Sequence, residues 1–400
     1  MSGEILVLNS GSSSIKFALY TAARDPALVL QGMISGIDAS PGFSAEDADG
    51  RPLPANLPEG GAAPLTHETA LARLFDWLAR GGHSTELLGA GHRVVHGGVR
   101  YAEPVRIDAG VYAELERLVP LAPLHQPHNL AAIRVLMKLL PDLPQVACFD
   151  TAFHRTQPMI AQSFALPREI TAGGVQRYGF HGLSYEYIAG VLPQTLGTRA
   201  DGRVVVAHLG AGASMCAMLR RRSVATTMGF TALEGLMMGT RTGAIDPGVL
   251  FYLMREKSMT PAQVEDLLYH RSGLLGVSGV SSDMRLLLAS TDPHAREAIE
   301  LFCYRAAREL GSLAATVGGL DALVFTAGIG ERAAPVRARI CKQARWLGVE
   351  LDEAANREHR AVISTPSSRA TACVIPTDEE IIIARHTGRL LGIGNPGRAN

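Results

Sequence analysis

The sequence has few of the features expected of an exported or membrane-bound protein. It has five cysteines in 400 residues. The number is odd and no two form a CxxC pair, which indicates reduced thiols rather than a disulfide framework or a zinc site. No apolar run approaches the ~20 residues of a membrane helix, and residues 1–20 lack the basic region and apolar stretch of a signal peptide. We therefore expect a cytoplasmic protein that spans no membrane.

Charge is also scarce and balanced. Charged residues make up 19% of the chain, and 38 Lys plus Arg stand against 38 Asp plus Glu. This balance argues against a nucleic acid or a membrane surface as a partner, because both attract a basic excess. The chain is long enough for two domains of ordinary size.

Short apolar runs alternate with segments of helical periodicity, which indicates an α/β protein with mainly parallel sheets. Strands are expected at residues 5–8, 15–20, 92–96, 145–149, 204–207, 214–219 and 322–326. Helices are expected at residues 67–80, 127–140, 297–317 and from about residue 334. Residues 38–66, rich in Pro, Gly, Ala and Asp, are expected to form loops and a variable insertion.

One weak internal repeat is present. Residues 6–11 and 205–210 each contain an apolar strand, a polar residue and the beginning of a glycine-containing turn. The two segments lie about half a chain apart, which fits a duplicated α/β protein with a ligand between its halves.

Three glycine-containing segments are candidate phosphate sites. The first is the Gly-Ser run after Asn9, with Lys16 six residues beyond Ser10. Small residues expose backbone N–H groups, which bind phosphate oxygens. The alternative for this run is an ordinary serine-rich hairpin turn. The segments 210–212 and 328–330 offer similar surfaces, the last between a strand and a helix, where a nucleotide can meet free N–H groups.

Several charged residues lie where a site would need them. Arg93 and Arg241 carry the forked guanidinium that suits phosphoryl and carboxylate oxygens, although either could instead pair a buried carboxylate. Asp150 closes a strand, where a site carboxylate or a helix cap is equally expected. Glu379 and Glu380 could hold magnesium or could simply be charges at a helix N-terminus.

Two histidines have distinctive neighbours. His181 lies between Phe180 and Gly182, and His125 lies between two prolines in the segment 123–127. Without further context, a lone histidine is more often structural than catalytic. The thirteen histidines form no HExxH or comparable metal motif.

Taken together, these segments resemble the acetate kinase family. The resembling segments occur in family order over nearly the whole chain, and the ordered set is highly specific. They are residues 9–16 (NSGSSSIK), 92–98 (HRVVHGG), 121–125 (LAPLH), 149–154 (FDTAFH), 177–182 (RYGFHG), 208–210 (HLG), 228–241 (MGFTALEGLMMGTR), 283–285 (DMR), 328–331 (GIGE) and 377–380 (TDEE).

The resemblance implies the actin-like, ribonuclease H-like fold: two duplicated α/β domains, each with a mixed sheet flanked by helices, and an active-site cleft between them. The first domain would comprise residues 1–150 plus about 385–400, because the family's C-terminal helix packs back on it. The second, nucleotide-binding domain would comprise residues 151–384. The resemblance also implies a homodimer, Mg²⁺ (with Mn²⁺ as a substitute), and ATP and acetate as substrates.

Roles are carried over only onto matching positions. The resemblance implies that Asn9 and Glu379 bind the metal, that Arg93 and His125 bind the carboxylate substrate, and that Asp150, His181 and Arg241 are catalytic. The implied nucleotide contacts are Lys16, His208, Leu209, Gly210, Ala211, Gly212, Asp283, Met284, Arg285, Gly328, Ile329, Gly330, Glu331 and Arg332.

The chain departs from the family pattern at four positions. Ala211 replaces an Asn in the turn after His208, and Arg332 replaces an Asn after the GIGE segment. Ala244 replaces a frequent Asp, and Gln126 replaces an Asn after His125. None removes a charged catalytic group, but Arg332 bears on nucleotide preference and Ala244 on the loop after Arg241.

The reaction expected is direct in-line transfer between the acetate oxygen and the γ-phosphate of ATP, with Mg²⁺, Arg93, Arg241 and His181 sharing the charge. Acetate is ionised at neutral pH, so no general base is needed. Asp150 is therefore expected to position Mg²⁺, water or an arginine. The alternatives are a propionate or butyrate kinase, a non-catalytic ATP-binding regulatory module, and a catalytically idle homologue.

Overall fold

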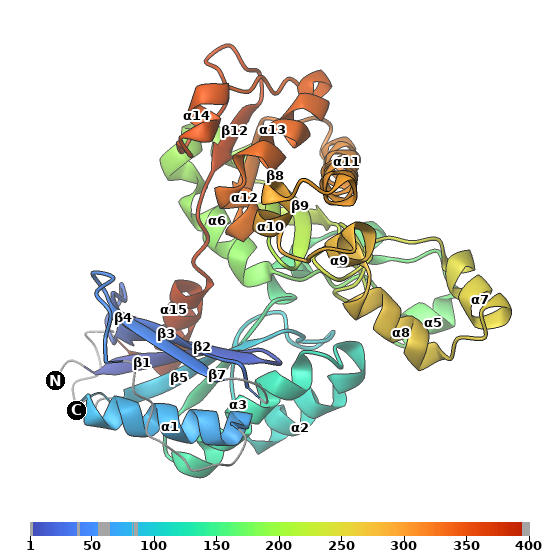
Figure 1. Ribbon diagram of the computed structural model, residues 1–400. Coiled ribbons are helices and arrows are strands. Elements are labelled where there is room, and N and C mark those ends of the chain that lie inside the picture. Colours follow the sequence, from blue (N-terminus) through green and yellow to red (C-terminus); the bar gives the residue numbers. More distant parts are fainter. Residues whose placement is uncertain (1–2, 38–40, 55–64, 82, 84–86, 394–400) are drawn as a thin grey trace. The chain divides into compact units, whose positions relative to one another are not determined.

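The computed structural model describes residues 3–37, 41–54, 65–81, 83 and 87–393. The chain divides into two compact units, each of which contains helices and strands (Figure 1). Unit 1 comprises Met1–Ala152 and Asp378–Asn400, and unit 2 comprises Phe153–Thr377. The boundary expected near residue 385 falls inside the last helix, α15 (Glu379–Leu391), which belongs wholly to unit 1.

Unit 1 is built on a seven-stranded mixed sheet in the order β4-β3-β2-β1-β5-β7-β6. Its strands are β1 (Glu4–Ser10), β2 (Ser14–Thr21), β3 (Leu28–Ser35), β4 (Gly42–Asp47), β5 (Leu87–Val94), β6 (Val105–Arg106) and β7 (Gln145–Phe149). The helices α1 (His67–Arg80), α2 (Ala109–Arg117) and α3 (Gln126–Leu139) lie on one face, and α15 lies on the other (Figure 1). Apolar side chains of α1 and α3 pack against the inner face of β1, β2 and β3 in one core.

The close packing of α15 on the sheet depends on glycine. A Cβ atom on Gly91 of β5 would lie 2.3 Å from Thr387 Oγ1 and 2.5 Å from Ile383 Cγ2, both on α15. The helix therefore lies directly over the strand. This packing brings the N-terminus of α15 to the carboxyl ends of β1, β5 and β7.

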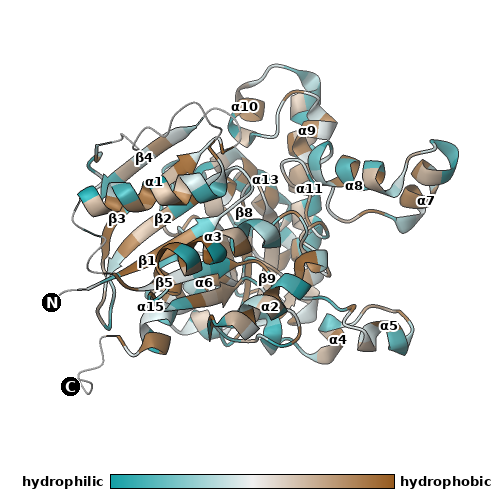
Figure 2. Cartoon of the chain, turned by 90° about the horizontal axis from the view of Figure 1, so that it is seen from below, coloured by the Kyte–Doolittle hydropathy of each residue, from teal (hydrophilic) through white to brown (hydrophobic). Residues whose placement is uncertain are grey.

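Unit 2 contains a five-stranded mixed sheet in the order β10-β9-β8-β11-β12. Its strands are β8 (Arg203–Leu209), β9 (Ala213–Leu219), β10 (Arg222–Thr226), β11 (Ala322–Thr326) and β12 (Thr371–Val374). Its helices are α4 (Met159–Gln162), α5 (Arg168–Ala172), α6 (Gly182–Leu196), α7 (Pro247–Glu256), α8 (Pro261–His270), α9 (Gly273–Ser278), α10 (Met284–Ala289), α11 (Pro293–Thr316), α12 (Ala327–Arg332), α13 (Ala334–Gln343) and α14 (Glu353–Arg357). Helices α5, α7 and α8 project from its body (Figures 1 and 2).

The two sheets repeat one pattern. In unit 1, β1 pairs antiparallel with β2 and parallel with β5, which pairs parallel with β7. In unit 2, β8 pairs antiparallel with β9 and parallel with β11, which pairs parallel with β12. This is the duplicated α/β architecture with mixed sheets that the sequence led us to expect, and the weak repeat marks the equivalent hairpins.

Most expected elements are confirmed, among them α1, β7 and β11, whose bounds match the prediction. Three expectations were wrong. Residues 42–47 form the strand β4 rather than a loop, because Phe43 and Ala45 pack on the core while the residues between them face outward. The strand expected at 92–96 ends at Val94. Residues 328–330 lie inside the short helix α12 and are not an open turn.

Of the expected loop, residues 38–40 and 55–64 lie outside the described residues. Over the described part of the chain, no helix is both long enough and apolar enough to span a bilayer. All five cysteines fall within it; they are buried and none forms a disulfide.

Candidate active site

In unit 1, the predicted site residues gather around Arg93. Arg93 Nη2 donates to Asp150 Oδ2 at 2.6 Å, and Arg93 Nε donates to both carboxylate oxygens at 3.1 and 3.2 Å. Arg93 Nη1 donates to Asn9 Oδ1 at 3.2 Å. The fourth member, Glu379, places Oε2 3.8 Å from Arg93 Nε. Four residues distant in the sequence thus form one cluster.

The sheet explains why these residues meet. Asn9, Arg93 and Asp150 lie at or just beyond the carboxyl ends of the adjacent strands β1, β5 and β7, and Glu379 is the first residue of α15. Carboxyl ends of parallel strands share one edge of a sheet, where ligands of α/β proteins bind. The Asp150 carboxylate accepts hydrogen bonds from Arg93 with both of its oxygens.

Electrostatics in this cluster favour an additional positive charge. Burial raises the pKa of Glu379 to about 7; Arg93 and Lys16 oppose this shift, while Asp150 and Glu380 add to it. Burial by itself would lower the pKa of Arg93, but the carboxylates of Asp150 and Glu379 raise it. Lys16 is the cross-strand partner of Asn9.

The donor set suits a hard cation. Asn9, Asp150 and Glu379 offer oxygen atoms, the ligands that Mg²⁺ prefers, and burial raises the pKa of Glu379 even with Arg93 and Lys16 near it. Within the described residues, no group of three or more His, Cys, Asp or Glu side chains could hold a metal ion.

The first turn of α3 supports the same edge. His125 precedes α3, and the next residue, Gln126, is fully buried. Gln126 Nε2 donates to His96 O at 3.1 Å, and its Oε1 accepts from His96 N at 3.2 Å. Asn129 Nδ2 donates to Ser10 O at 2.7 Å. These amides fix the ends of β1 and β5, so Gln126 can serve as an adequate replacement for Asn.

In unit 2, the turn between β8 and β9 forms the floor of a second cluster. A Cβ atom on Gly212 would lie 3.3 Å from His181 Nε2 and 3.8 Å from Arg241 Nη1. Both side chains therefore border the space above Gly212, which a larger residue would fill. The turn is closed by Gly210 N donating to Gly212 O at 3.0 Å. An imidazole, a guanidinium and bare backbone around one space suit a phosphoryl group.

His181 occupies an unusual backbone position. It is the N-cap residue of α6, with φ 58° and ψ 27° in the left-handed region. A non-glycine residue in this region costs of order 1–3 kcal/mol and is concentrated at functional sites. The strained cap aims the imidazole at the β8–β9 turn.

Two hydroxyl chains hold the histidines of this cluster. His181 stacks on His208 with ring centroids 4.2 Å apart and an interplanar angle of 15°. Ser214 Oγ lies 2.9 Å from His181 Nδ1 and 2.6 Å from the hydroxyl of Tyr185. On the other ring, His208 Nδ1 lies 2.8 Å from Ser184 Oγ. Both imidazole rings are therefore held in orientation by contacts of their Nδ1 atoms with buried serine hydroxyls.

The GIGE segment, residues 328–331, is linked by hydrogen bonds to the hydroxyl group that holds His208. Glu331 Oε1 accepts from Ala327 N at 2.8 Å and from Thr377 N at 3.2 Å. Thr377 Oγ1 lies 2.8 Å from Ser184 Oγ, which holds His208. The Glu331 carboxylate thus organises the start of α12. Burial beneath α12 leaves the hydroxyl of Thr326 without a protein partner among the described residues.

Behind α12 lies a buried arginine that the sequence analysis missed. Arg337 has no exposed surface, and Nη1 donates to Gly330 O at 2.9 Å and to Glu331 O at 2.7 Å. Its Nε donates to Asn356 Oδ1 at 2.8 Å. Burial lowers the pKa of Arg337. Its contacts satisfy carbonyls at the end of α12 and so fix the predicted nucleotide-binding segment.

The remaining predicted nucleotide residues begin α10. Asp283 caps this helix by accepting from Arg285 N at 2.8 Å, and Arg285 Nη2 donates to Asp283 Oδ2 at 2.6 Å. Met284 is buried, whereas the Arg285 side chain is exposed. The pair is therefore preformed at the surface of unit 2.

Arg241 lies on a segment held largely by its backbone. Gly239 N donates to Ala211 O at 3.0 Å, which couples the segment to the β8–β9 turn through a carbonyl that any residue provides. This explains how Ala211 can replace Asn without loss of that contact. Arg241 Nη1 donates to Ala232 O at 2.9 Å. The carbonyl of Ala244 accepts from Arg305 Nη1 at 3.3 Å, and here too the contact needs no side chain.

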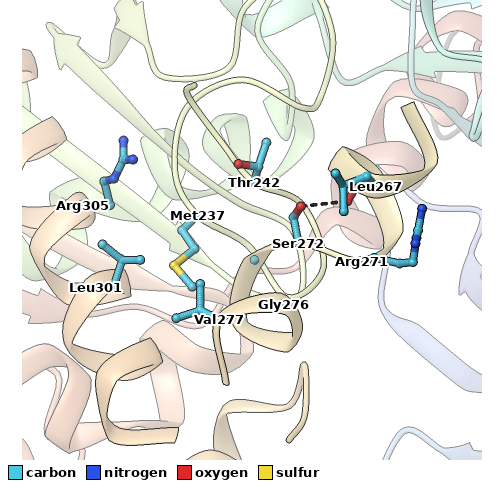
Figure 3. Close-up of a pocket in the computed structure, with 10 residues that line it drawn as sticks. Met237, Thr242, Leu267, Arg271, Ser272, Gly276, Val277, Leu301 and Arg305 are labelled. Atoms are coloured by element: carbon cyan, nitrogen blue, oxygen red, sulfur yellow. Dashed lines mark hydrogen bonds between the residues drawn. The ribbon is translucent and has the colours of Figure 1, made fainter. Parts of the chain in front are cut away.

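A cavity of about 340 Å³ borders this segment at Met237 and Thr242 (Figure 3). Its lining residues are Met237, Thr242, Leu267, Arg271, Ser272, Gly273, Gly276, Val277, Leu301 and Arg305. Gly273 allows close contact here: its φ is 61°, and a Cβ atom on it would lie 2.2 Å from Met238 O.

Arg332 is the last of the four departures from the family pattern. It is exposed at the end of α12.

The residues that the sequence analysis missed are those that orient others: Ser184, Tyr185, Ser214, Arg337 and Asn129. No motif identifies them, because their partners are distant in the chain. The one usable signal was the spacing of Gln126 and Asn129 on the first turn of a predicted helix, where side chains three apart share a face.

Comparison with known proteins places this geometry in one family. The model of the acetokinase family matches residues 4–385. An acetate kinase of Rhodopseudomonas palustris is 60% identical over 397 residues, covering 98% of this chain and 99% of that protein, and one of Nitrobacter hamburgensis is 52% identical over 394 residues, covering 97% and 96%.

Solved structures agree. A propionate kinase of Francisella tularensis has a TM-score of 0.90 at 36% identity, covering 97% of this chain and all of that chain. The acetate kinase of Porphyromonas gingivalis has a TM-score of 0.86 at 36% identity, with 98% and 100% covered. The resemblance inferred from the motifs and the expected fold are both confirmed: the chain belongs to the acetokinase family.

Proposed function

We propose that the chain is an acetate kinase, which reversibly transfers the γ-phosphoryl group of ATP to acetate to give acetyl phosphate and ADP. The single observation that carries this proposal is the space above Gly212. His181 Nε2 and Arg241 Nη1 both border it, so two nitrogen atoms that can donate face one position. The relatives that have high identity over their full length are named acetate kinases, and this supports acetate as the substrate.

The unit 1 cluster would bind the carboxylate and the metal. Arg93 has five N–H donors; among the described residues, one hydrogen on Nη1 and one on Nη2 are not needed for Asn9 and Asp150. Two parallel N–H groups are what a carboxylate accepts in a bidentate pair. Asp150 would act by holding Arg93 in position, and His125 would contribute to the same substrate site.

The same cluster would hold Mg²⁺. Asn9 and Glu379 would be its protein ligands, directly or through water, and Lys16 would face the phosphates from the neighbouring strand. When bound, Mg²⁺ neutralises charge on the phosphate oxygens of ATP. Mn²⁺, with similar oxygen-ligand preferences, would substitute for it.

The unit 2 cluster would hold the nucleotide and the migrating group. The backbone of residues 208–212, the start of α10 and residues 328–332 would contact ATP. His181 and Arg241 would donate to the phosphoryl oxygens in the transition state, where preorganised donors contribute most. Acetate is already ionised at neutral pH and attacks as the carboxylate. The transfer is therefore direct and needs no general base.

The test is an ATP–acetate assay coupled to ADP formation, with acetate, propionate and butyrate compared at the same ATP concentration. We expect the highest kcat/KM with acetate and a loss of about a hundredfold or more in kcat for Arg241→Ala, the size reported for removal of one transition-state donor. No turnover with any of the three acids, or an unaffected Arg241→Ala variant, would refute the proposal.

Propionate is the second candidate substrate, favoured by the structural match to a propionate kinase. The much higher identity to acetate kinases argues for the shorter acid. A kcat/KM for propionate above that for acetate would reverse this order. One extra methylene is worth only about 1–3 kcal/mol in a pocket, so some turnover of propionate is expected in either case.

We also propose that the enzyme is a cytoplasmic homodimer. Helix α7 buries none of its residues and exposes Phe251 and Tyr252 at 52% each, while α4 exposes Ile160 at 85%. Figure 2 shows apolar residues on α7, one of the helices that project from the body of unit 2. Such exposed apolar surface is expected where a second copy packs. A monomer in analytical ultracentrifugation at micromolar concentration would refute the dimer.

A further inference from the structure

The hydroxyl chain behind His181 determines more than the orientation of its ring. The Tyr185 hydroxyl lies 2.6 Å from Ser214 Oγ, and Ser214 Oγ lies 2.9 Å from His181 Nδ1. Tyr185 and Ser214 are both fully buried, with 0% of each residue exposed. Neither side chain can exchange its partner for bulk water.

The direction of each hydrogen bond follows from counting hydrogens. A phenol has one hydrogen, and the large majority of buried polar groups are hydrogen-bonded, so we assign the Tyr185 hydroxyl as a donor. Among the described residues, Ser214 is the partner that the structure provides for the Tyr185 hydroxyl. Burial also raises the pKa of Tyr185 well above 10, so the hydroxyl remains protonated.

Ser214 therefore accepts a hydrogen bond from Tyr185 and has its own hydrogen left to donate. Within the described residues, its second neighbour is His181 Nδ1, so the Ser214 hydrogen is used in this chain when Nδ1 accepts it. A neutral imidazole with an accepting Nδ1 carries its hydrogen on Nε2. Nε2 is the atom that borders the space above Gly212.

The Tyr185 ring is itself fixed by other rings. It meets His154 edge-on with centroids 5.5 Å apart and His208 edge-on at 6.3 Å, and it stacks on Phe153 at 6.4 Å. The hydroxyl is thus presented from a rigid aromatic cluster. A change of tautomer at His181 would require this cluster or Ser214 to move.

We propose that Tyr185, acting through Ser214, is a positioning residue that holds His181 in the tautomer with its hydrogen on Nε2, so that His181 is poised to donate to the migrating phosphoryl group. This inference rests on the proposed role of His181. It adds to that role a proton location set by two hydroxyl groups that do not touch the substrate.

The test combines Tyr185→Phe with a direct measurement of the tautomer. Phenylalanine keeps the ring packing and removes only the oxygen, so Ser214 becomes free to accept from Nδ1. With ¹⁵N-labelled histidine, the two-bond ¹H–¹⁵N correlations identify which ring nitrogen carries hydrogen, and a His181→Asn variant assigns the signal. Tyr101→Phe is the matched control, because its hydroxyl contacts Glu114 in unit 1.

In the wild-type protein we expect His181 with its hydrogen on Nε2. In Tyr185→Phe we expect population of the Nδ1–H form and a kcat lowered about fivefold, the effect of one lost hydrogen bond, with both KM values within twofold. Tyr101→Phe should change neither. If Tyr185→Phe does not fold, Ser214→Ala tests the same hydroxyl chain at its middle residue.

The outcomes separate this inference from the proposed function. A wild-type ring with its hydrogen on Nδ1, or a Tyr185→Phe variant with unchanged tautomer and kcat, overturns the role of Tyr185 while leaving acetate kinase activity intact. A tautomer change without a change in kcat overturns it as well. Full activity in His181→Asn would instead refute the proposed role of His181 itself.

Discussion

The ion pair between Arg93 and Asp150 should be strongly coupled in energy. Asp150 has 1% of its side chain exposed, and Arg93 contacts both of its oxygens. Removing one partner of a buried pair costs about 3–5 kcal/mol, because the other charge is left uncompensated. Arg93 retains some exposure, so we expect about 3 kcal/mol for Arg93→Met, a large share of a total stability of about 5–15 kcal/mol.

A double-mutant cycle with Asp150→Asn measures the coupling. Once Asp150 is neutral, loss of the guanidinium no longer leaves the Asp150 carboxylate buried without its partner. The double variant should therefore be more stable than the two single losses predict, by about 2 kcal/mol. Strict additivity would show that Asp150 does not hold Arg93 in the folded protein and would refute its proposed positioning role.

The chain offers a clean probe and control for this experiment. It has two tryptophans, Trp77 and Trp346. Trp77 packs against Phe43 in unit 1, whereas Trp346 is exposed in unit 2. In a Trp346→Phe background, urea unfolding followed by fluorescence reports on unit 1 alone. The exposed pair of Lys138 and Glu68 is the control and should show no coupling beyond error.

Three further outcomes are expected. Gly212→Ala places a Cβ beside His181 Nε2 and should lower kcat roughly tenfold to a hundredfold without loss of stability; unchanged steady-state kinetics would contradict this. Burial lowers the pKa of His154 to about 4 from 6.5, so unfolding takes up a proton and stability should fall by up to about 3 kcal/mol as pH drops from 6.5 to 4; His154→Gln should flatten that slope in urea titrations, and an equal slope would contradict the assignment. Arg337→Met leaves the carbonyls at the end of α12 without their hydrogen-bond donor and should raise KM for ATP but not for acetate. Equal effects on both KM values would argue against a local role of Arg337.

Motif residues at strand ends were predictable because strand ends are marked by local sequence. Asn9, Arg93 and Asp150 each follow or close an apolar run, and parallel strands bring such ends together. Tyr185 and Ser214 were not predictable, because their contact joins residues 29 apart through an antiparallel hairpin and a helix start that spacing alone does not align.

Tertiary contacts also overrode local propensity in two places. Gly328 and Gly330 disfavour a helix, yet α12 forms because Glu331 accepts from its first N–H and Arg337 satisfies its last carbonyls. Residues 42–47 lie in a segment of loop-like composition, yet pairing with β3 makes them a strand.

The two hairpins, β1–β2 and β8–β9, place site residues at equivalent positions of their ladders. Asn9 faces Lys16 one pair before the end of the β1–β2 ladder, and His208 faces Ser214 one pair before the end of the β8–β9 ladder. Equivalent positions of the two hairpins therefore carry different chemistry: an amide and an amine in unit 1, and an imidazole and an alcohol in unit 2.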